Sequence, residues 1–188
     1  MVNQIILASK SEVRKKILED NKIVCKVEPS NVDEDSVKES LLKEKATPTN
    51  ISKNLAELKA NKISQKFINE IVLGADSIID LEGEIISKPN NRAEALKILQ
   101  KLNGKTHHLV SSVCISKGGF MIWNYTDKAS LTMKNMNTLD LEAYLKKISD
   151  KKLYAYNVYQ IEGEGRGLFS KIEGDKDTIM GLPIRQIK

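Results

Sequence analysis

The segment Ile71–Ser77 reads Ile-Val-Leu-Gly-Ala-Asp-Ser and places a single acid directly after an apolar run. A short apolar run that ends at a glycine is typical of a buried strand. Glu82-Gly83 then marks a tight turn, and the chain returns through Ser87-Lys88-Pro89. The pattern predicts two paired strands that present the Asp76 carboxylate and the Lys88 ammonium. These two charges, on a backbone fixed by glycine and proline, suit chemistry on a phosphorylated substrate.

Strand and helix patterns continue along the chain on both sides of this hairpin. Strands are expected over residues 4–8 and 23–27, helices over 12–20, 37–45, 49–64, 91–102 and 138–148, and a long hairpin over 107–116 and 120–133. Val32–Asp35 is expected to be an acidic loop, and the Gly-rich chain from Tyr154 onward to be irregular. Strands interspersed with helices predict an α/β fold, in which residues 1–188 form a single domain with a mixed β-sheet flanked by helices.

Composition restricts the class of protein more than its function. The 188 residues are 40% hydrophobic and 29% charged, as in ordinary soluble domains, and the net charge of +5 is compatible with an anionic ligand such as a nucleotide. Cys25 and Cys114 lie far apart, which argues against a disulfide scaffold and a cysteine metal cluster. The apolar run Ile5–Ala8 is too short for a signal-peptide core or a membrane span. We therefore expect a cytoplasmic protein with free thiols.

Ser9, Ser11 and Arg14 stand where the first predicted strand passes into a helix. A helix N-terminus has unpaired N–H groups and a partial positive charge, which suits a phosphate, and the two hydroxyls and the guanidinium would add donors. Taken alone, the same residues also fit an ordinary helix cap beside a solvated arginine. The Gly-rich pattern of a P-loop is missing.

Asp33, Glu34 and Asp76 are the acids considered for a divalent cation. Two neighbouring carboxylates can hold Mg²⁺ and polarise a water that attacks phosphorus. A polar loop is the simpler interpretation of Asp33 and Glu34, and a turn role competes for Asp76. Lys59, on the inner side of a predicted helix, either reaches a bound anion or carries its charge out to solvent, and its neighbours alone favour solvent.

The glycine-rich segment Tyr159–Gly165 contains Glu162 and admits two interpretations, a wall that reads the edge of a base or a plain surface loop. His107 and His108 have no catalytic spacing to a cysteine or serine, so we expect a structural role for them. Trp123 is expected in the core or at an interface.

The order of these motifs along the chain resembles the Maf family. The resemblance runs from Ile5 to Pro183 and covers nearly the whole chain. In chain order the matching segments are Leu7-Ala8-Ser9 with Ser11 and Arg14, Val32-Asp33-Glu34, Ala56 with Lys59-Ala60, Gly74-Ala75-Asp76, Lys88-Pro89, Leu102–His107, Tyr159 with Glu162-Gly163, Ile172–Asp175 and Gly181-Leu182-Pro183.

The resemblance implies a nucleoside triphosphate pyrophosphatase, which releases a nucleoside monophosphate and pyrophosphate with the help of a divalent metal such as Mg or Mn. It implies an α/β fold with two lobes around a nucleotide-binding cleft. Asp76 would activate water, and Glu34 and Asp76 would hold the metal. The substrate-binding residues that it implies are Ser9, Ser11, Arg14, Glu34, Lys59, Lys88 and Glu162.

The family resemblance also carries expectations about partners and cellular role. Family members are often homodimers and are associated with removing non-standard nucleotides and with septum formation and arrested division. Beyond the nucleoside triphosphate substrate, neither a membrane nor a stable nucleic-acid partner is expected.

Three positions depart from the family pattern and bear on base preference. The usual Ser-x-Ser-Pro-Arg-Arg stretch is Ser9–Arg14 here, with Val13 in place of the first arginine. Branches that prefer dTTP and UTP tend to carry that arginine, a threonine at Ser77 and a glutamine at Glu162. A glutamate can accept hydrogen bonds from the N1–H and amine of guanine, which favours 7-methyl-GTP, although Val13 is not the aromatic residue that branch often shows. The missing arginine also leaves open a non-catalytic nucleotide-sensing or nucleic-acid-binding regulator.

Overall fold

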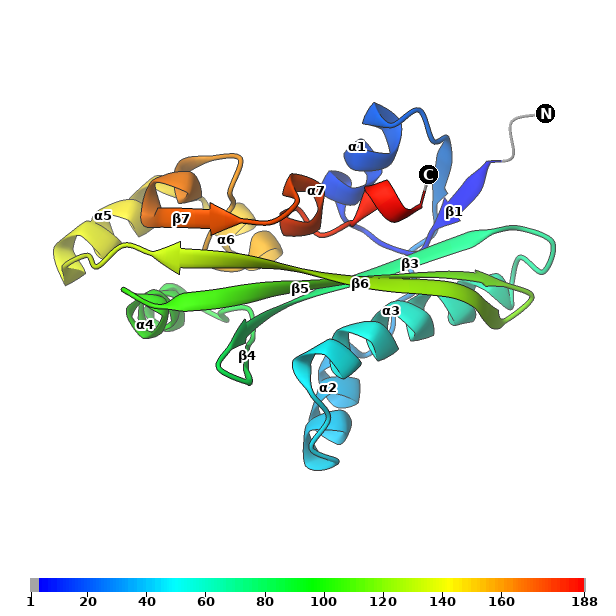
Figure 1. Ribbon diagram of the computed structural model, residues 1–188, viewed down its shortest axis with the longest axis horizontal. Coiled ribbons are helices and arrows are strands. Elements are labelled where there is room, and N and C mark those ends of the chain that lie inside the picture. Colours follow the sequence, from blue (N-terminus) through cyan, green and yellow to red (C-terminus); the bar gives the residue numbers. More distant parts are fainter. Residues whose placement is uncertain (1–3, 188) are drawn as a thin grey trace. The chain divides into compact units, whose positions relative to one another are not determined.

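The computed structural model describes residues 4–187, whose helices and strands are shown in Figure 1. The strands are β1 (Ile5–Leu7), β2 (Cys25–Val27), β3 (Val72–Leu81), β4 (Glu84–Ile86), β5 (Thr106–Lys117), β6 (Phe120–Met133) and β7 (Phe169–Glu173). The α-helices are α1 (Glu12–Asp20), α2 (Glu34–Lys43), α3 (Pro48–Ser64), α4 (Arg92–Leu102), α5 (Thr138–Lys147), α6 (Asp150–Tyr156) and α7 (Lys176–Ile179). Two 3-10 helices, η1 (Glu164–Leu168) and η2 (Ile184–Gln186), lie near the end of the chain.

The seven strands form one mixed sheet in the order β2-β1-β3-β5-β6-β7, and β4 pairs with β3 outside this path. β1 runs parallel to β2 and to β3, with Ile6 opposite Val72 in the second pairing. β4 is antiparallel to β3, and β7 is antiparallel to β6. The mixed sheet flanked by helices that the sequence predicts is therefore confirmed.

The described residues divide into two compact units. The first comprises the chain up to Ser77, Val110–Lys128 and the chain from Asp175, and the second comprises Ile78–Leu109 and Ala129–Gly174. The strands β3, β5 and β6 contribute residues to both.

In the first unit, helices cover both faces of the sheet. Figure 1 shows α1 and the C-terminal segment with α7 on one face and α3 on the other. The first face buries Leu7, Leu73 and Val113 against residues of α1 and the C-terminal segment. The opposite face buries Ile6, Val72 and Cys114, among others, against α3. Alternate residues of β1 thus pack in opposite directions, as the period of a strand requires.

Gly74 is needed because α3 crosses β3 at very short range. A Cβ built on Gly74 would lie 2.3 Å from the Ala56 carbonyl oxygen, 2.7 Å from the Ala60 nitrogen and 2.9 Å from the Ala60 Cβ. Two of these atoms belong to the backbone and cannot rotate away. The glycine therefore allows α3 to approach the strand two residues before Asp76.

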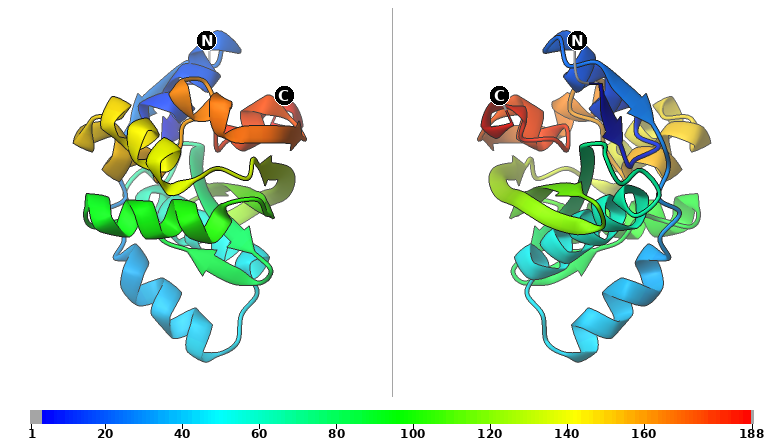
Figure 2. Two further views of the ribbon diagram at one scale, coloured as in Figure 1. Left: turned by 90° about the vertical axis from the view of Figure 1, so that its left-hand side faces the viewer. Right: turned by 90° about the vertical axis from the view of Figure 1, so that its right-hand side faces the viewer.

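In the second unit, α4 packs against α5, and Figure 2 (left) shows the two helices beside each other. A buried aromatic group lies in the same unit, where the His107 Nε2 and the Tyr159 hydroxyl are 2.7 Å apart and Phe169 contacts both rings. The predicted turn at Glu82-Gly83 joins β3 to β4, with φ of 55° and 91°. These left-handed values match a tight hairpin turn.

Local signals in the sequence place most of the elements correctly. Ser11 caps α1 as predicted, since its hydroxyl accepts a hydrogen bond from the Arg14 N–H. Asn91 and Asn137 cap α4 and α5. Gly118-Gly119 connects the two long strands of the predicted hairpin.

Two predictions about irregular chain are wrong. The expected acidic loop Val32–Asp35 ends in helix, because Asp33 caps α2 by accepting from the Ser36 N–H and hydroxyl, so that Glu34 and Asp35 form its first turn. The Gly-rich chain after Tyr154 contains β7, which obtains its hydrogen bonds from β6, and α7, which Asp175 caps. Capping by aspartate and pairing with a distant strand both outweigh the local glycine content.

Candidate functional site

The first unit contains a buried lysine between two carboxylates. The Lys59 Nζ, on α3, is 2.8 Å from the Asp76 Oδ1 and 2.9 Å from the Glu34 Oε1. The side chains of Lys59 and Asp76 are each 6% exposed, whereas that of Glu34 is 42% exposed. The expectation that Lys59 carries its charge out to solvent is wrong, because the two acids neutralise the ammonium inside the protein. The structure thus brings together three of the predicted site residues.

One carboxylate oxygen of Asp76 accepts a hydrogen bond, and the other has no partner among the described residues. Its Oδ1 accepts from Lys59, whereas its buried Oδ2 has no hydrogen-bond partner among the described residues. Its backbone carbonyl accepts from the hydroxyl of the buried Ser52, which fixes the strand at this position. A buried polar atom without a partner is rare and needs an explanation. At Asp76 it leaves an acceptor ready for a ligand, a water or a cation.

Arg14 connects three further segments of the same unit. Its Nε donates to the Gly181 carbonyl at 2.9 Å, its Nη1 to the Ser9 hydroxyl at 3.2 Å and its Nη2 to the Ser77 hydroxyl at 3.2 Å. Ser9, Arg14 and Ser77 are all predicted site residues, and the structure brings them together. An arginine held at all three nitrogens has a fixed plane, which suits recognition of a phosphate.

The electrostatics link Arg14 to the two acids. Burial lowers the pKa of Arg14 from its ordinary value, while the nearby charges of Asp76 and Glu34 oppose that shift. Burial acts to raise the pKa of Glu34, but the charge and hydrogen bond of Lys59, together with the charges of Lys38 and Arg14, lower it overall. Glu34 is therefore an anion at neutral pH. Cations and anions alternate in this part of the first unit, an arrangement that can bind a phosphate chain together with a metal.

The donor set at Glu34 and Asp76 fits a hard divalent cation. Carboxylate oxygens suit Mg²⁺, which proteins often bind through one or two carboxylates with the remaining ligands supplied by water and phosphate. The Asp76 Oδ1, which keeps a further lone pair beside its bond to Lys59, supplies one such oxygen and the exposed Glu34 carboxylate another. Among residues 4–187 no cluster of three or more His, Cys, Asp or Glu side chains is placed to hold a metal without such help.

Lys88 and Glu162 belong to the second unit. Lys88 follows the end of β4 and is exposed. Glu162 lies on the exposed loop before η1, where its Oε1 accepts from the Gln160 Nε2 at 3.3 Å.

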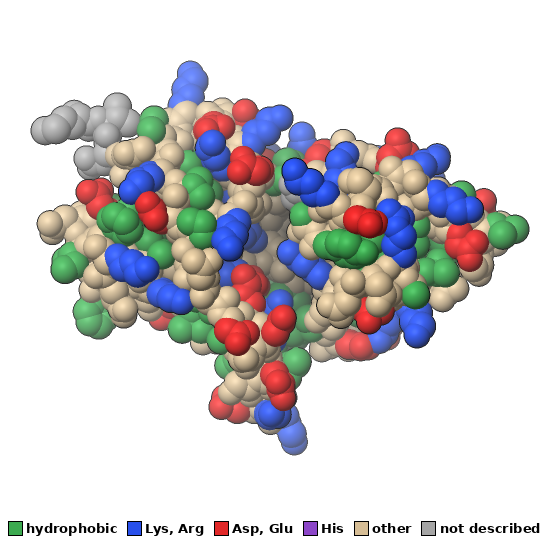
Figure 3. All heavy atoms as spheres, turned by 180° about the vertical axis from the view of Figure 1, so that it is seen from behind, with side chains coloured by type: hydrophobic (Ala, Val, Ile, Leu, Met, Phe, Trp, Pro, Cys, Tyr) green, Lys and Arg blue, Asp and Glu red, His purple; other side chains and the backbone are tan. Residues whose placement is uncertain are grey.

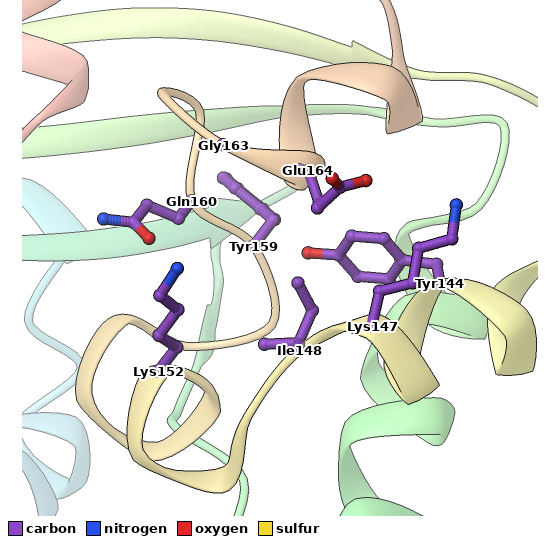
Figure 4. Close-up of a pocket in the computed structure, with 9 residues that line it drawn as sticks. Tyr144, Lys147, Ile148, Lys152, Tyr159, Gln160, Gly163 and Glu164 are labelled. Carbon is purple, nitrogen blue, oxygen red and sulfur yellow. The ribbon is translucent and has the colours of Figure 1, made fainter.

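A small hollow opens beside the Glu162 loop, between that loop and helices α5 and α6. Figure 4 shows Lys152 and Gln160 on one side of it and Lys147 and Glu164 on the other. Tyr144 also lines the hollow, and its hydroxyl donates to the Val158 carbonyl at 2.9 Å. Glu162 itself is not among the residues that line this hollow.

Comparison with known proteins places these residues in a family context. A family model described as Maf-like protein matches residues 4–188. The chain belongs to the Maf-like protein family. A nucleoside triphosphate pyrophosphatase from Pelagibacter ubique (strain HTCC1062) is 82% identical over 188 residues, which cover 100% of this chain and 96% of that protein.

More distant relatives of this Maf-like chain cover almost the same length. A nucleoside triphosphate pyrophosphatase from Ruegeria sp. (strain TM1040) is 36% identical over 100% of this chain and 94% of that protein. A 7-methyl-GTP pyrophosphatase from Brucella abortus biovar 1 (strain 9-941) is also 36% identical, over 98% of this chain and 92% of that protein.

The remaining predicted residues of this Maf-like chain have structural contacts of their own. Ser11 caps α1, and its N–H donates to the Ser9 hydroxyl at 3.2 Å. Val13 packs against the hydrophobic cluster beneath α1, so its side chain is part of the core boundary. Base discrimination by Val13 stays a prediction. His107 is fully buried, and burial together with the neighbouring His108 lowers its pKa to about 4.

Sequence reasoning missed three groups that complete the arginine site. The Gly181 carbonyl accepts from Arg14, the Ser111 hydroxyl contacts Ser77, and the Thr178 carbonyl accepts from Ser111. Two of the three are backbone atoms, which every residue has, so no pattern of side chains marks them. Gly181 was recognised only as part of a family motif.

The surface is mixed in charge. Figure 3 shows Lys and Arg side chains interspersed with Asp and Glu over the visible face. A search of the described residues finds no helix both long and apolar enough to cross a membrane.

Proposed function

We propose that this chain hydrolyses nucleoside triphosphates to a nucleoside monophosphate and pyrophosphate, with Asp76 as the general base. The observation that carries the proposal is the buried Asp76 carboxylate, which is held at one oxygen by Lys59 and has the other unused. The Pelagibacter ubique relative, 82% identical and named a nucleoside triphosphate pyrophosphatase, supports the same activity.

Asp76, Lys59, Arg14 and Ser9 of the first unit have separate roles in the proposed reaction. Asp76 takes a proton from a water through its free Oδ2, while Lys59 keeps Oδ1 fixed and balances the carboxylate charge. The water oxygen then bonds to the α-phosphorus, the bond from that phosphorus to the bridging oxygen breaks, and the bridging oxygen leaves with pyrophosphate. Arg14 neutralises charge on the phosphates, with Ser9 setting its orientation. Positioning and charge neutralisation are the main requirements of phosphoryl transfer.

Glu34 and Asp76 are the residues that would hold a divalent metal, either Mg²⁺ or Mn²⁺. Such an ion, when bound, neutralises phosphate charge and lowers the pKa of a coordinated water. Glu34 reaches the site from the first turn of α2, where its carboxylate is half exposed and shares Lys59 with Asp76. The two carboxylates share the ammonium of Lys59 directly, and the neighbouring Arg14 supplies a second positive charge. The triphosphate would bring the further negative charge that a divalent cation balances.

We assign substrate contacts in the second unit to Lys88 and Glu162. Lys88 would bind phosphate as an exposed ammonium on a rigid Pro-flanked segment. Glu162 would accept from the N1–H and amine of a guanine, with Gln160 holding one of its oxygens. The 7-methyl-GTP pyrophosphatase from Brucella abortus among its relatives makes that modified nucleotide the first candidate substrate.

Release of pyrophosphate from a nucleotide panel tests the proposal. The panel contains the ordinary ribo- and deoxyribonucleoside triphosphates and 7-methyl-GTP, with Mg²⁺ or Mn²⁺. We expect pyrophosphate from at least one of them. Binding without pyrophosphate release would instead support the nucleotide-sensing alternative, and release of orthophosphate would mean a different bond is cleaved.

Asp76→Asn isolates the base within the same assay. This variant should lower turnover by about 10²–10⁴-fold, the usual contribution of a general base, while nucleotide affinity changes little. Asp80→Asn is the matched control, because Asp80 lies on the same strand and only accepts from the Gly83 N–H in the turn. Equal turnover in the two variants would remove Asp76 from the mechanism.

A further inference from the structure

We propose that Ser111 and the turn Thr178–Gly181 position Arg14, and that they do so by forcing the Ser77 hydroxyl to act as an acceptor. Ser111 is thus a positioning residue for triphosphate binding, and the inference rests on the proposed function for its choice of ligand. In this arrangement Ser77 orients the Arg14 guanidinium and does not bind the substrate directly.

The hydrogen bond between Ser111 and Thr178 has a fixed direction. Ser111 is fully buried on β5, and its hydroxyl lies 2.8 Å from the Thr178 carbonyl oxygen. A carbonyl can only accept, so the single hydroxyl hydrogen of Ser111 points to Thr178. The Ser111 Oγ also lies 3.0 Å from the Ser77 Oγ. Since Ser111 has no hydrogen left, Ser77 must donate to it.

The direction of the Ser111 hydroxyl also sets the direction of the Ser77 hydroxyl. Its one hydrogen is directed at Ser111, and the Gly181 carbonyl at 3.5 Å is a longer alternative. The lone pairs of Ser77 are left to accept from the Arg14 Nη2, which is 3.2 Å away. The chain of donors therefore runs in one direction, from the Arg14 guanidinium through Ser77 and Ser111 to the Thr178 carbonyl. Although Ser77 is exposed, it has no hydrogen to offer a phosphate.

The backbone carbonyl of Gly181 binds the Nε side of the Arg14 guanidinium. Its carbonyl accepts from the Arg14 Nε at 2.9 Å, and its φ of +99° is accessible chiefly to glycine. A Cβ here would lie 3.0 Å from the Ser77 Oγ and 3.6 Å from the Arg14 Nε. The turn thus contacts both the arginine and its serine partner.

The turn is itself fixed from two directions. Asp175 caps α7 through the Asp177 and Thr178 N–H groups, and its other oxygen pairs with the Arg185 Nε at 2.7 Å. The hydroxyl of the buried Thr178 donates to the Asp127 Oδ2 at 2.6 Å. The Thr178 and Gly181 carbonyls are therefore rigid acceptors.

The bonds of Arg14 to protein use three of its five N–H groups. The two that remain, one on each terminal nitrogen, have no partner among the described residues. Two parallel N–H groups can bind two oxygens of a phosphate, provided that the plane of the guanidinium is set in advance. Ser111 and the turn set that plane, although neither has to touch the substrate.

Ser111→Ala tests the inference, with Ser112→Ala as its matched control. Ser112 is the next residue of β5, equally buried, and its hydroxyl bonds to Thr126 at 2.8 Å without contacting Arg14 or Ser77. The readouts are KM and kcat for the best triphosphate, and the calorimetric affinity for its non-hydrolysable α,β-methylene analogue. We expect Ser111→Ala to raise KM and weaken analogue binding about tenfold, as for one loosened bond to a charged group. Ser112→Ala should change neither by more than about twofold.

Two further variants separate positioning from folding. Ser111→Thr keeps the hydroxyl on a strand that tolerates β-branched residues, and should restore the affinity to within about threefold. Ser77→Ala combined with Ser111→Ala should bind the analogue no worse than either single variant, because both interrupt one chain of bonds. If Ser111→Ala does not fold, Ser111→Cys keeps the volume and weakens the donor, and takes its place.

The outcomes distinguish this inference from the proposed function. One outcome is that the unaltered chain releases pyrophosphate while Ser111→Ala and Ser112→Ala have the same KM and the same affinity for the analogue. That result would overturn the inference and leave the proposed function intact. Additive losses in the double variant would also overturn it. The opposite outcome is that the unaltered chain binds the analogue without releasing pyrophosphate, and that Ser111→Ala weakens this binding whereas Ser112→Ala does not. That result would overturn the proposed function and support the inference. Failure of the unaltered chain to bind the analogue would overturn both.

Discussion

Lys59→Met should cause one of the largest losses of stability that a single substitution in this chain can produce. Methionine keeps most of the side-chain length but removes the charge that faces the buried Asp76 carboxylate at 2.8 Å. At an effective dielectric constant of about 20, that separation corresponds to an attraction of about 6 kcal/mol. Desolvation of the two ions offsets part of it, but the substitution leaves the carboxylate buried without its partner.

The expected loss in the free energy of unfolding is about 3–5 kcal/mol, the usual effect of removing one partner of a buried pair. The Asp76 contact decides this value, because Glu34 is 42% exposed and a contact of that kind contributes about 1 kcal/mol at most. Domains of this kind are stable by about 5–15 kcal/mol in total, so the substitution would remove about a fifth of that stability or more.

Urea unfolding followed by circular dichroism measures the loss, with linear extrapolation to water. Lys62→Met is the control, since Lys62 lies one turn further along α3, is exposed and donates to the Asn31 carbonyl at 2.9 Å. It should change stability by about 0.5 kcal/mol or less. In an Asp76→Asn background the cost of Lys59→Met should fall by at least about 1 kcal/mol. Equal losses for Lys59→Met and Lys62→Met would refute the account of a buried, mutually dependent pair.

Three further predictions concern other parts of the chain. Gly74→Ala should destabilise by about 3 kcal/mol or more in urea unfolding, because the added Cβ meets α3 backbone, whereas Gly167→Ala, with open space around it, should be near neutral. Burial lowers the pKa of His107 in the folded chain to about 4, below its ordinary 6.5. Between these two pH values the unfolded chain binds more protons than the folded chain. The free energy of unfolding should therefore fall by about 3 kcal/mol as the pH drops through that range. His107→Gln should flatten this part of a pH series of melts, and His108→Gln, which removes only the smaller cause of the shift, should flatten it less. Glu34→Gln should raise the Mg²⁺ concentration needed for half-maximal pyrophosphate release about tenfold, and an unchanged requirement would exclude Glu34 as a ligand.

The elements that were predicted correctly are those whose signals lie within a few residues of each other. The cap at Ser11, the turn at Glu82-Gly83 and the connection at Gly118-Gly119 all depend on local backbone geometry. The start of α2 differs from the expected loop although a local signal is present: Asp33 is an N-cap residue, and the acids Glu34 and Asp35 that follow it form the first turn of the helix.

The parts that could not be predicted depend on residues far apart in the sequence. Lys59 and Asp76 are 17 residues apart and meet because Gly74 lets α3 approach β3. On a helix pattern alone, a lysine beside apolar neighbours is expected to reach solvent, and only the position of Asp76 reverses that expectation. The strand β7 likewise exists only because β6 offers it hydrogen bonds.

The bond from Arg14 to Gly181 spans 167 residues, and this separation has a consequence for biosynthesis. Contacts between distant residues form late in folding, because the intervening chain must first be made and ordered. While residues 175–188 are not yet synthesised, the guanidinium lacks its carbonyl partner and Ser111 lacks the acceptor that sets the direction of its hydroxyl. We expect a ribosome-bound chain to bind nucleotides weakly until the segment that holds Thr178 and Gly181 has emerged. The fold thereby ties the onset of activity to completion of this segment.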